Sequence, residues 1–218
     1  MAMLEAAVAG RRTGGHPHVQ APDFERLLDH EAWAGLPADV RRRFARHASQ
    51  VVYPGQLEVR ASWFGWLIAQ VLRLAGTPLA PWRGPDVPTD VTVWQDSQGA
   101  LVWDRAYRFK GRQTLTVSSR KLVGDDGALL EITRGGLGMS LSVEAEPGGL
   151  VFRSREYFLQ LGPLRLPIPM LITPGPVVVR HTDLGAGDFR FEMTFRHPWF
   201  GDTLHQAGVF TDPFNAVS

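Results

Sequence analysis

Short runs in which apolar and polar residues alternate fill most of the chain from residue 89 onward. In "DFRFEMTFRH", Phe189, Phe191, Met193 and Phe195 occupy every second position, the period of a β-strand with one buried face. Glycine-containing segments such as "DSQG" and "GDDG" separate these runs, as tight turns require. The pattern predicts strands at residues 55–62, 89–95, 101–109, 113–122, 128–133, 138–145, 149–158, 177–182, 188–197 and 202–211.

Short turns between neighbouring strands favour antiparallel pairing, and closure of a sheet removes its exposed edges. We therefore expect a mainly β fold, either a lipocalin-like antiparallel barrel of about ten strands or a strongly curved sheet. Residues 22–218 form a single domain in this interpretation, after a flexible N-terminal arm at 1–21. Proline density is expected to preclude regular structure at 78–88 and to interrupt the strands at 161–176.

Helical patterns occur near residues 23–50 and 63–75, and the first region is expected to cover one end of the barrel. The second contains "WFGWLIAQVLRLAG", which is apolar on nearly all sides and therefore predicts a helix buried on most of its surface. It is shorter than the roughly 20 residues that span a bilayer, so no transmembrane segment is predicted. A membrane-interface role ranks third among the functional interpretations, because Arg73 is the only basic residue of this helix.

Charge and composition narrow the possible partners. A formal net charge of +1 gives no overall attraction to nucleic acid, and the Arg41–Arg43 cluster is interpreted as the solvated face of a helix, so no nucleic-acid partner is expected. The chain has no cysteine, which excludes disulfides, zinc–thiolate sites and cysteine nucleophiles. The N-terminal arginines follow a short apolar run, the wrong order for a secretory signal, and we expect a cytoplasmic protein. Basic residues are almost all arginine, with Lys110 and Lys121 the only lysines.

One strand places an arginine among aromatic residues. In "VWDRAYRF", alternation puts Trp103, Arg105, Tyr107 and Phe109 on the same face. An arginine taken inward with aromatic side chains needs a partner, and Glu131 is the candidate because it lies in the middle of an apolar strand. Two interpretations follow: an ion pair that fixes strand register, or an arginine that binds a carboxylate or enolate in an apolar pocket.

Other polar and aromatic residues on inward faces extend this set. His181 shares its face with two valines, and no nucleophile elbow, phosphate loop or HExxH motif is present, so neither a metal nor a cofactor is predicted. The candidate catalytic residues are Arg105, Glu131, His181 and His205. The candidate ligand-binding residues are Trp103, Tyr107, Phe109, Met139, Tyr157, Phe191 and Met193.

Several phrases of the chain resemble a bacterial family known as domain-of-unknown-function family 4166. They are Trp103-x-Arg105-x-x-x-Phe109, the glycines that follow Glu131, the "LPxP" stretch around residues 167–169, and "HPxxG" at 197–201. The resemblance extends from about residue 24 to residue 211. In that family the domain occurs alone or fused behind a Rossmann-type oxidoreductase similar to saccharopine dehydrogenase.

The resemblance implies that Arg105 and Glu131 belong to the family motif. It also implies two departures, because the family tends to carry an acid near His181 and a tyrosine near His205. Histidines at both positions suggest an altered pocket that contains an acid–base group titrating near neutral pH.

Two functions are therefore expected as alternatives. In the first, the barrel binds a hydrophobic small molecule, either without catalysis or as a cofactor-independent cyclase or isomerase of a polyketide- or terpene-like intermediate. In the second, the domain is a non-catalytic partner that docks on a separate oxidoreductase through an exposed apolar patch. Candidates for that patch are Trp63, Phe64 and Trp66, or the "HPWF" turn.

Overall fold

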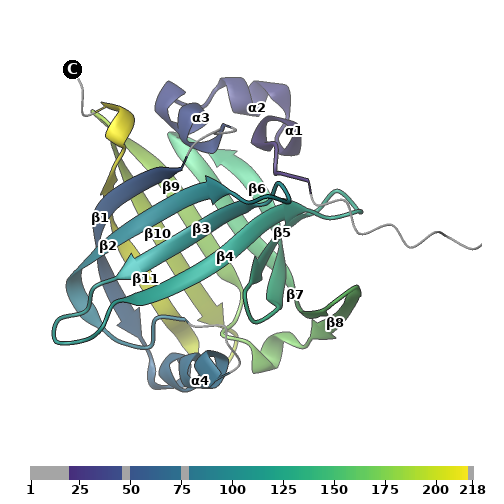
Figure 1. Ribbon diagram of the computed structural model, residues 1–218, viewed down its shortest axis with the longest axis vertical. Coiled ribbons are helices and arrows are strands. Elements are labelled where there is room, and N and C mark those ends of the chain that lie inside the picture. The colour runs from purple at the N-terminus through teal and green to yellow at the C-terminus, as the bar shows by residue number, and fades with distance from the viewer. Residues whose placement is uncertain (1–19, 46–49, 75–78, 216–218) are drawn as a thin grey trace, which may run out of the picture.

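Antiparallel strands form a closed barrel, as the alternation predicted (Figure 1). This computed structural model describes residues 20–45, 50–74 and 79–215, so most of the expected N-terminal arm lies outside the described residues. The strands are β1 (Val51–Ala61), β2 (Gly84–Gln95), β3 (Leu101–Tyr107), β4 (Leu115–Val123), β5 (Leu129–Thr133), β6 (Leu137–Glu146), β7 (Gly149–Leu161), β8 (Leu164–Ile168), β9 (Val177–Gly185), β10 (Asp188–His197) and β11 (Gly201–Thr211).

The ring of strands runs β6-β5-β4-β3-β2-β1-β11-β10-β9-β7, and pairing of β6 with β7 closes it. The first part of β7 pairs with β9 and its last part with β8, which lies outside the ring. The prediction of a mainly β, antiparallel, lipocalin-like barrel is confirmed, with one strand more than expected. Inward residues such as Phe189, Phe191 and Phe195 are buried, whereas Arg190 and Arg196 on the opposite face are exposed.

Both proline-rich segments contain strand residues that the sequence interpretation missed, namely the beginning of β2 and the whole of β8. β2 begins at Gly84, inside the segment expected to be irregular, and Pro88 takes part because its carbonyl accepts the N–H of Arg108 at 3.0 Å. β8 places Pro167 opposite Phe158 in an outermost strand. A proline removes a donor but not an acceptor, and an outer strand tolerates this loss.

Helices cover both ends of the barrel (Figure 1). α1 (Phe24–Leu27), α2 (His30–Ala34) and α3 (Ala38–Phe44) lie over one end, as expected, and α4 (Trp63–Leu74) lies at the opposite end. Two short 3₁₀ helices, η1 (Met170–Ile172) and η2 (Pro213–Asn215), follow β8 and β11. We refer below to the α1–α3 end and the α4 end.

Ion pairs hold α3 on the barrel. Arg43 is buried, donates to Asp183 at 2.9 Å and lies 4.5 Å from the ring centroid of Phe189, while Arg42 pairs with Asp212 at 3.0 Å. The interpretation of this arginine cluster as a solvated face is therefore wrong for Arg43. A guanidinium is tolerated in the interior when a carboxylate and hydrogen bonds compensate its charge.

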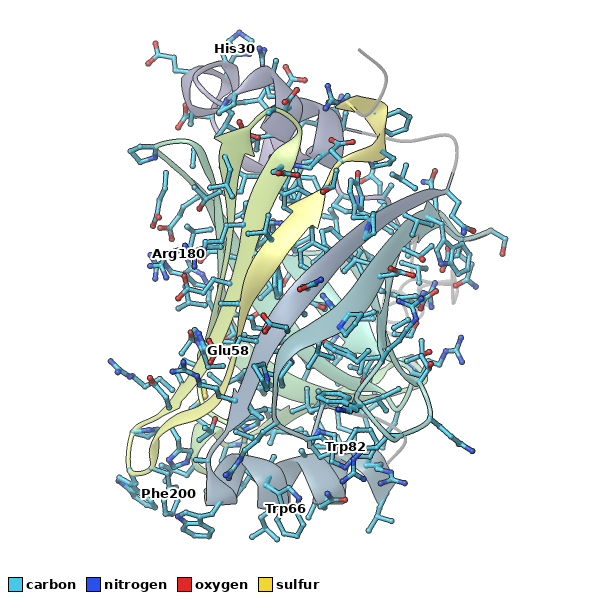
Figure 2. All side chains as sticks on the ribbon, turned by 90° about the vertical axis from the view of Figure 1, so that its left-hand side faces the viewer. His30, Glu58, Trp66, Trp82, Arg180 and Phe200 are labelled. Atoms are coloured by element: carbon cyan, nitrogen blue, oxygen red, sulfur yellow. The ribbon has the colours of Figure 1, made fainter. Side chains whose placement is uncertain are left out.

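The surface of α4 also differs from expectation. Gly65 and Ala69 are its buried residues, whereas Trp66 and Leu74 are exposed. Gly65 packs so close to β11 that an added Cβ would lie 1.9 Å from the carbonyl oxygen of Thr203. Figure 2 shows Trp66 at the α4 end, opposite His30 of α2. The prediction of a helix buried on most sides is wrong, because only its narrow small-residue face meets the barrel.

Candidate ligand-binding site

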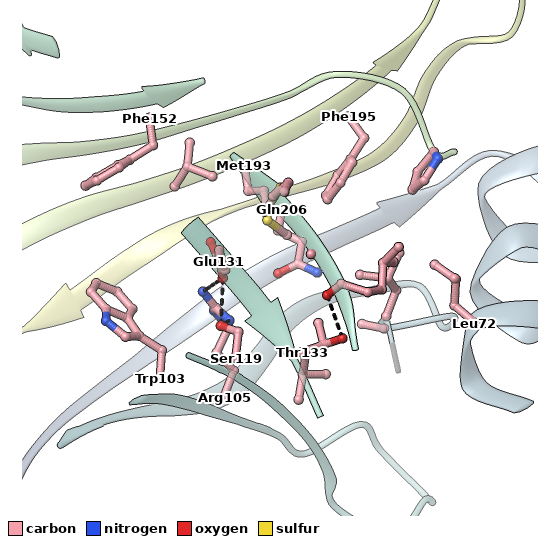
Figure 3. Close-up of a pocket in the computed structure, with 18 of the residues that line it drawn as sticks. Leu72, Trp103, Arg105, Ser119, Glu131, Thr133, Phe152, Met193, Phe195 and Gln206 are labelled. Carbon is pink, nitrogen blue, oxygen red and sulfur yellow. Dashed lines mark hydrogen bonds and ion pairs between the residues drawn. The ribbon is translucent and has the colours of Figure 1, made fainter. Parts of the chain in front are cut away.

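A cavity of about 90 Å³ lies inside the barrel and extends toward α4, which contributes Leu72 to its wall (Figure 3). Much of the remaining wall is aromatic or methionine: Trp103 from β3, Met139 from β6, Phe152 from β7 and Met193 from β10. These residues are distant in sequence and meet because every second side chain of each strand points inward. The barrel thus contains a space suited to an apolar group.

A buried polar cluster lies in one wall of this cavity, across the adjacent strands β3, β4 and β5. Arg105 Nη2 lies 3.6 Å from Glu131 Oε1, and Lys121 Nζ lies 3.1 Å from Glu131 Oε2. Ser119 donates to Glu131 at 2.6 Å and accepts from Arg105 at 3.2 Å. The side chains of Arg105, Lys121 and Glu131 are only 11%, 6% and 9% exposed, so these ion pairs are largely removed from water. The predicted pairing of Arg105 with Glu131 is confirmed.

The cluster contains two cations and one carboxylate. Burial alone would raise the pKa of Glu131, but the charges of Lys121 and Arg105 and the hydrogen bond from Ser119 lower it to about 2. Burial lowers the pKa of Lys121 to about 8, because the attraction of Glu131 only partly offsets desolvation and the repulsion of Arg105. At pH 7 Glu131 is ionised and Lys121 is mostly protonated, so the cluster has a net positive charge.

Trp103 lies beside this cluster and also lines the cavity. Its ring centroid is 4.4 Å from Lys121 Nζ and 5.8 Å from Arg105 Cζ, distances at which a ring stabilises a cation. The indole N–H is buried and has no hydrogen-bond partner among the described residues. Within the described chain, this N–H is therefore an unsatisfied donor buried in the barrel.

His181 lies at the cavity wall in an aromatic cage. Phe44, Phe191 and Trp103 approach its ring with centroids 5.1, 5.3 and 5.6 Å away. Desolvation lowers the pKa of His181 well below its usual value, and the positive charges of Lys121 and the nearby arginines lower it further. The expectation that this histidine titrates near neutral pH is wrong, because it stays uncharged there.

Two tyrosines line the cavity with their hydroxyls already engaged. Tyr107 donates to Gln206 at 2.9 Å, and Tyr157 donates to the backbone carbonyl of Gly175 at 2.9 Å. Burial raises the pKa of both phenols, so they remain protonated at neutral pH. Both side chains fix the shape of the wall and neither supplies a free proton.

Three predicted site residues lie outside this cavity. Phe109 is buried in the core against Trp82, with ring centroids 5.3 Å apart. Phe191 lines a smaller space of about 20 Å³ between the cluster and α3. His205 follows the opposite alternation from Gln206 and hydrogen bonds to Thr194 at 2.9 Å instead of lining the cavity. The structure therefore does not bring His205 together with Arg105, contrary to the expected polar set.

The sequence interpretation missed Lys121, Ser119 and Gln206. A signal for the lysine was present, because Lys110 and Lys121 are the only lysines in a chain whose other basic residues are arginines. The position of Lys121 opposite Glu131 follows from the register of β4 with β5, which alternation within a single strand does not specify.

Within residues 20–45, 50–74 and 79–215, no three histidine or acidic side chains gather closely enough to hold a metal ion. In the same part of the chain, no helix combines the length and apolarity needed to cross a bilayer.

The chain matches a family of protein domains. Neither a curated protein nor a solved structure matches the chain. Residues 36–210 match a family described as a domain of unknown function, DUF4166, and this range includes every residue that lines the cavity. The match agrees with the resemblance noted from the tryptophan–arginine motif of β3 and from Glu131. The chain therefore belongs to the DUF4166 family.

Proposed function

We propose that the barrel binds a hydrophobic small molecule that carries an anionic or strongly polarised oxygen. The apolar part of the molecule would contact Trp103, Met139 and Met193, and its oxygen would approach Lys121 and Arg105. One observation carries the proposal: an apolar cavity borders a buried cluster in which two cations share one carboxylate.

The charge balance of the cluster favours an oxyanion. Burial of an uncompensated positive charge is costly, and a ligand carboxylate or enolate beside Lys121 would neutralise it. A neutral alcohol cannot neutralise this charge, so selectivity for acids over matched alcohols is expected.

The size of the cavity also constrains the ligand. Drug-sized molecules occupy sites of about 300 to 1,000 Å³, whereas this cavity measures about 90 Å³. A larger ligand requires movement of the wall, and Met139 and Met193 are suited to this because unbranched thioethers repack easily. Leu72 of α4 is a third wall residue whose displacement would enlarge the space.

The test compares two probes that share a chain and differ in the head group, octanoate and 1-octanol, by isothermal titration calorimetry without vesicles. We expect octanoate to bind more tightly to the wild type, because a charge-assisted contact contributes about 1.5 to 3 kcal/mol. Lys121→Met should weaken octanoate binding by roughly ten-fold or more and leave octanol unchanged. Lys110→Met removes the other lysine, which is exposed, and is the matched control.

Native mass spectrometry of the purified protein would identify a co-purifying molecule directly. Equal affinity for the acid and the alcohol in the wild type would contradict the proposed head group. An empty protein that binds neither probe would contradict the proposed function as a whole.

A catalytic role is the second candidate, and the position of Lys121 in the cavity wall beside Arg105, with its pKa lowered by burial to about 8, is the observation that favours it. A lysine that ionises near physiological pH can carry a proton while a neighbouring cation stabilises an enolate, as isomerisation or cyclisation next to a carbonyl requires. Deuterium exchange at the carbon next to the carbonyl of a bound ketone, such as 2-octanone, tests this role by NMR. Exchange no faster with the wild type than with Lys121→Met would exclude the lysine as the proton carrier.

A further inference from the structure

The α4 end of the barrel presents many exposed large apolar side chains. Trp63, Trp66 and Leu74 of α4, Ile172 of η1 and Trp199 of the β10–β11 turn are between 47% and 91% exposed. Figure 2 shows Trp66 and Phe200 together at this end of the molecule. Side chains of this size and number exceed what an isolated surface normally leaves in water, so a partner surface is expected here.

Exposed basic residues lie at the same end of the barrel. Because the strands alternate in direction, the segments that follow β1, β3 and β7 emerge at the α4 end. These connections, α4 and β8 contain exposed basic residues that are far apart in sequence. They are Arg73, Arg83, Lys110, Arg112 and Arg165. None of the five forms an ion pair with another described residue.

Acidic residues near this end are few and mostly paired. Asp90 pairs with Arg108, and Arg196 Nε lies 2.8 Å from Asp202 Oδ1. Asp86 of β2 is exposed and forms no ion pair within the described chain. The α4 end therefore combines exposed tryptophans and aliphatic side chains with a surplus of positive charge.

The opposite end has a different surface. Its connections contain Asp96, Asp125 and Asp126, and α3 is held there by buried ion pairs. The two ends of the barrel therefore differ in charge, and the α4 end suits a partner that is both apolar and negatively charged.

We propose that the α4 end docks on the surface of an anionic lipid bilayer. Tryptophan and leucine side chains insert at the level of the lipid head groups, and basic residues attract acidic lipids. A lipid surface satisfies both features at once, because the apolar and the basic residues lie at the same end of the barrel. The cavity reaches the same end at Leu72, so a ligand that partitions into lipid would have a short path to it. The docking itself does not depend on the identity of that ligand.

Vesicle flotation of the full chain tests the proposal. One set of vesicles contains phosphatidylcholine alone and the other includes about 30 mol% phosphatidylglycerol. We expect binding to the anionic vesicles, with several-fold weaker binding to phosphatidylcholine. Raising the salt concentration from about 0.1 M to about 0.5 M should weaken it further, because salt screens the basic residues.

Matched variants separate the two contributions. Leu74→Ser removes an apolar side chain at the α4 end, and Leu184→Ser removes an exposed leucine near the α1–α3 end. Lys110→Glu and Arg190→Glu make the same charge change at the α4 end and on the outer face of β10. We expect Leu74→Ser to weaken binding at least about five-fold and Lys110→Glu roughly ten-fold. The variants at Leu184 and Arg190 should bind as the wild type does.

Three outcomes would overturn the proposal. The first is an absence of binding at either lipid composition. The second is equal binding to neutral and anionic vesicles. The third is equal loss of binding in each variant and its control. A chain that ignores vesicles but forms a dimer lost in Leu74→Ser would show instead that the α4 end is a protein interface. Circular dichroism of each variant confirms that its fold is retained.

Discussion

Replacement of Glu131 by glutamine should be among the most destabilising isosteric changes in this protein. The carboxylate lies between Lys121 and Arg105, and all three side chains are nearly buried. Glu131→Gln keeps the shape of the side chain but leaves two cations close together without a counter-charge. The pKa of the carboxyl falls from 4.5 to about 2 in the folded protein. That shift corresponds to about 3 kcal/mol of stabilisation at neutral pH.

We therefore expect Glu131→Gln to lower the free energy of unfolding by about 3 to 5 kcal/mol, the usual cost of breaking a buried ion pair from one side. Lys121→Met should cost less than about 1 kcal/mol, because it leaves Arg105 paired with Glu131 and removes the surplus charge. The double variant should be more stable than Glu131→Gln alone, since one of the two uncompensated cations is gone.

Urea unfolding at pH 7, followed by tryptophan fluorescence, measures all three variants. A loss within about 1 kcal/mol for Glu131→Gln would refute the argument, as would an equal loss for Lys121→Met. The pH dependence provides an independent check. Because the pKa of Glu131 is lowered by folding, its stabilisation is present above pH 4.5 and is lost as the pH falls toward about 2. Over this range Glu131→Gln should lose less stability than the wild type.

Three further predictions concern Lys121, His181 and Gly65. Folding lowers the pKa of Lys121 from 10.5 to about 8. The wild type should therefore become more stable as the pH increases from about 8 to 10.5, and Lys121→Met should show no such increase in urea titrations. Folding also lowers the pKa of His181 below 6.5, so its contribution to stability is full above that pH and falls in more acidic solution. His181→Phe should reduce this acid sensitivity in thermal melts. Gly65→Ala should destabilise by about 1 to 3 kcal/mol because its Cβ would meet Thr203, whereas Gly35→Ala, with 3.4 Å to its nearest atom, should cost less.

The sequence was sufficient to predict the barrel because each strand needs only its own alternation to be recognised. β10 shows this, since Phe189, Phe191 and Phe195 are all buried and the predicted bounds match the observed strand. β8 was missed because proline was taken to exclude a strand, although an outer strand needs fewer donors than an inner one. Local pattern therefore predicts most strands, and the exceptions depend on where a strand lies in the sheet.

The polar cluster was only half predictable for a related reason. Arg105 and Glu131 are conspicuous in the sequence, because each is a charged residue among apolar neighbours and such a residue requires a partner. Lys121 is not conspicuous, because it follows Ser118, Ser119 and Arg120 in a strand of mostly polar residues. Its role depends on the place of β4 between β3 and β5, because the register of β4 with β5 sets Lys121 directly opposite Glu131. The second cation of the site is therefore found only when the pairing register is known.

α4 shows how a correct pattern can lead to a wrong conclusion. A short helix that is apolar on all sides must bury its surface, and burial within the chain was the simplest solution. The structure gives it only a narrow contact, because Gly65 and Ala69 bring its backbone close to β11 and leave its large side chains facing outward. The low count of basic residues in this helix weighed against a membrane surface, but the barrel brings Lys110 and Arg112 to the same end from the β3–β4 connection. The apolar face of α4 and the basic residues beside it are therefore properties of the folded barrel, and the same assembly explains why a lipid surface is the partner to test first.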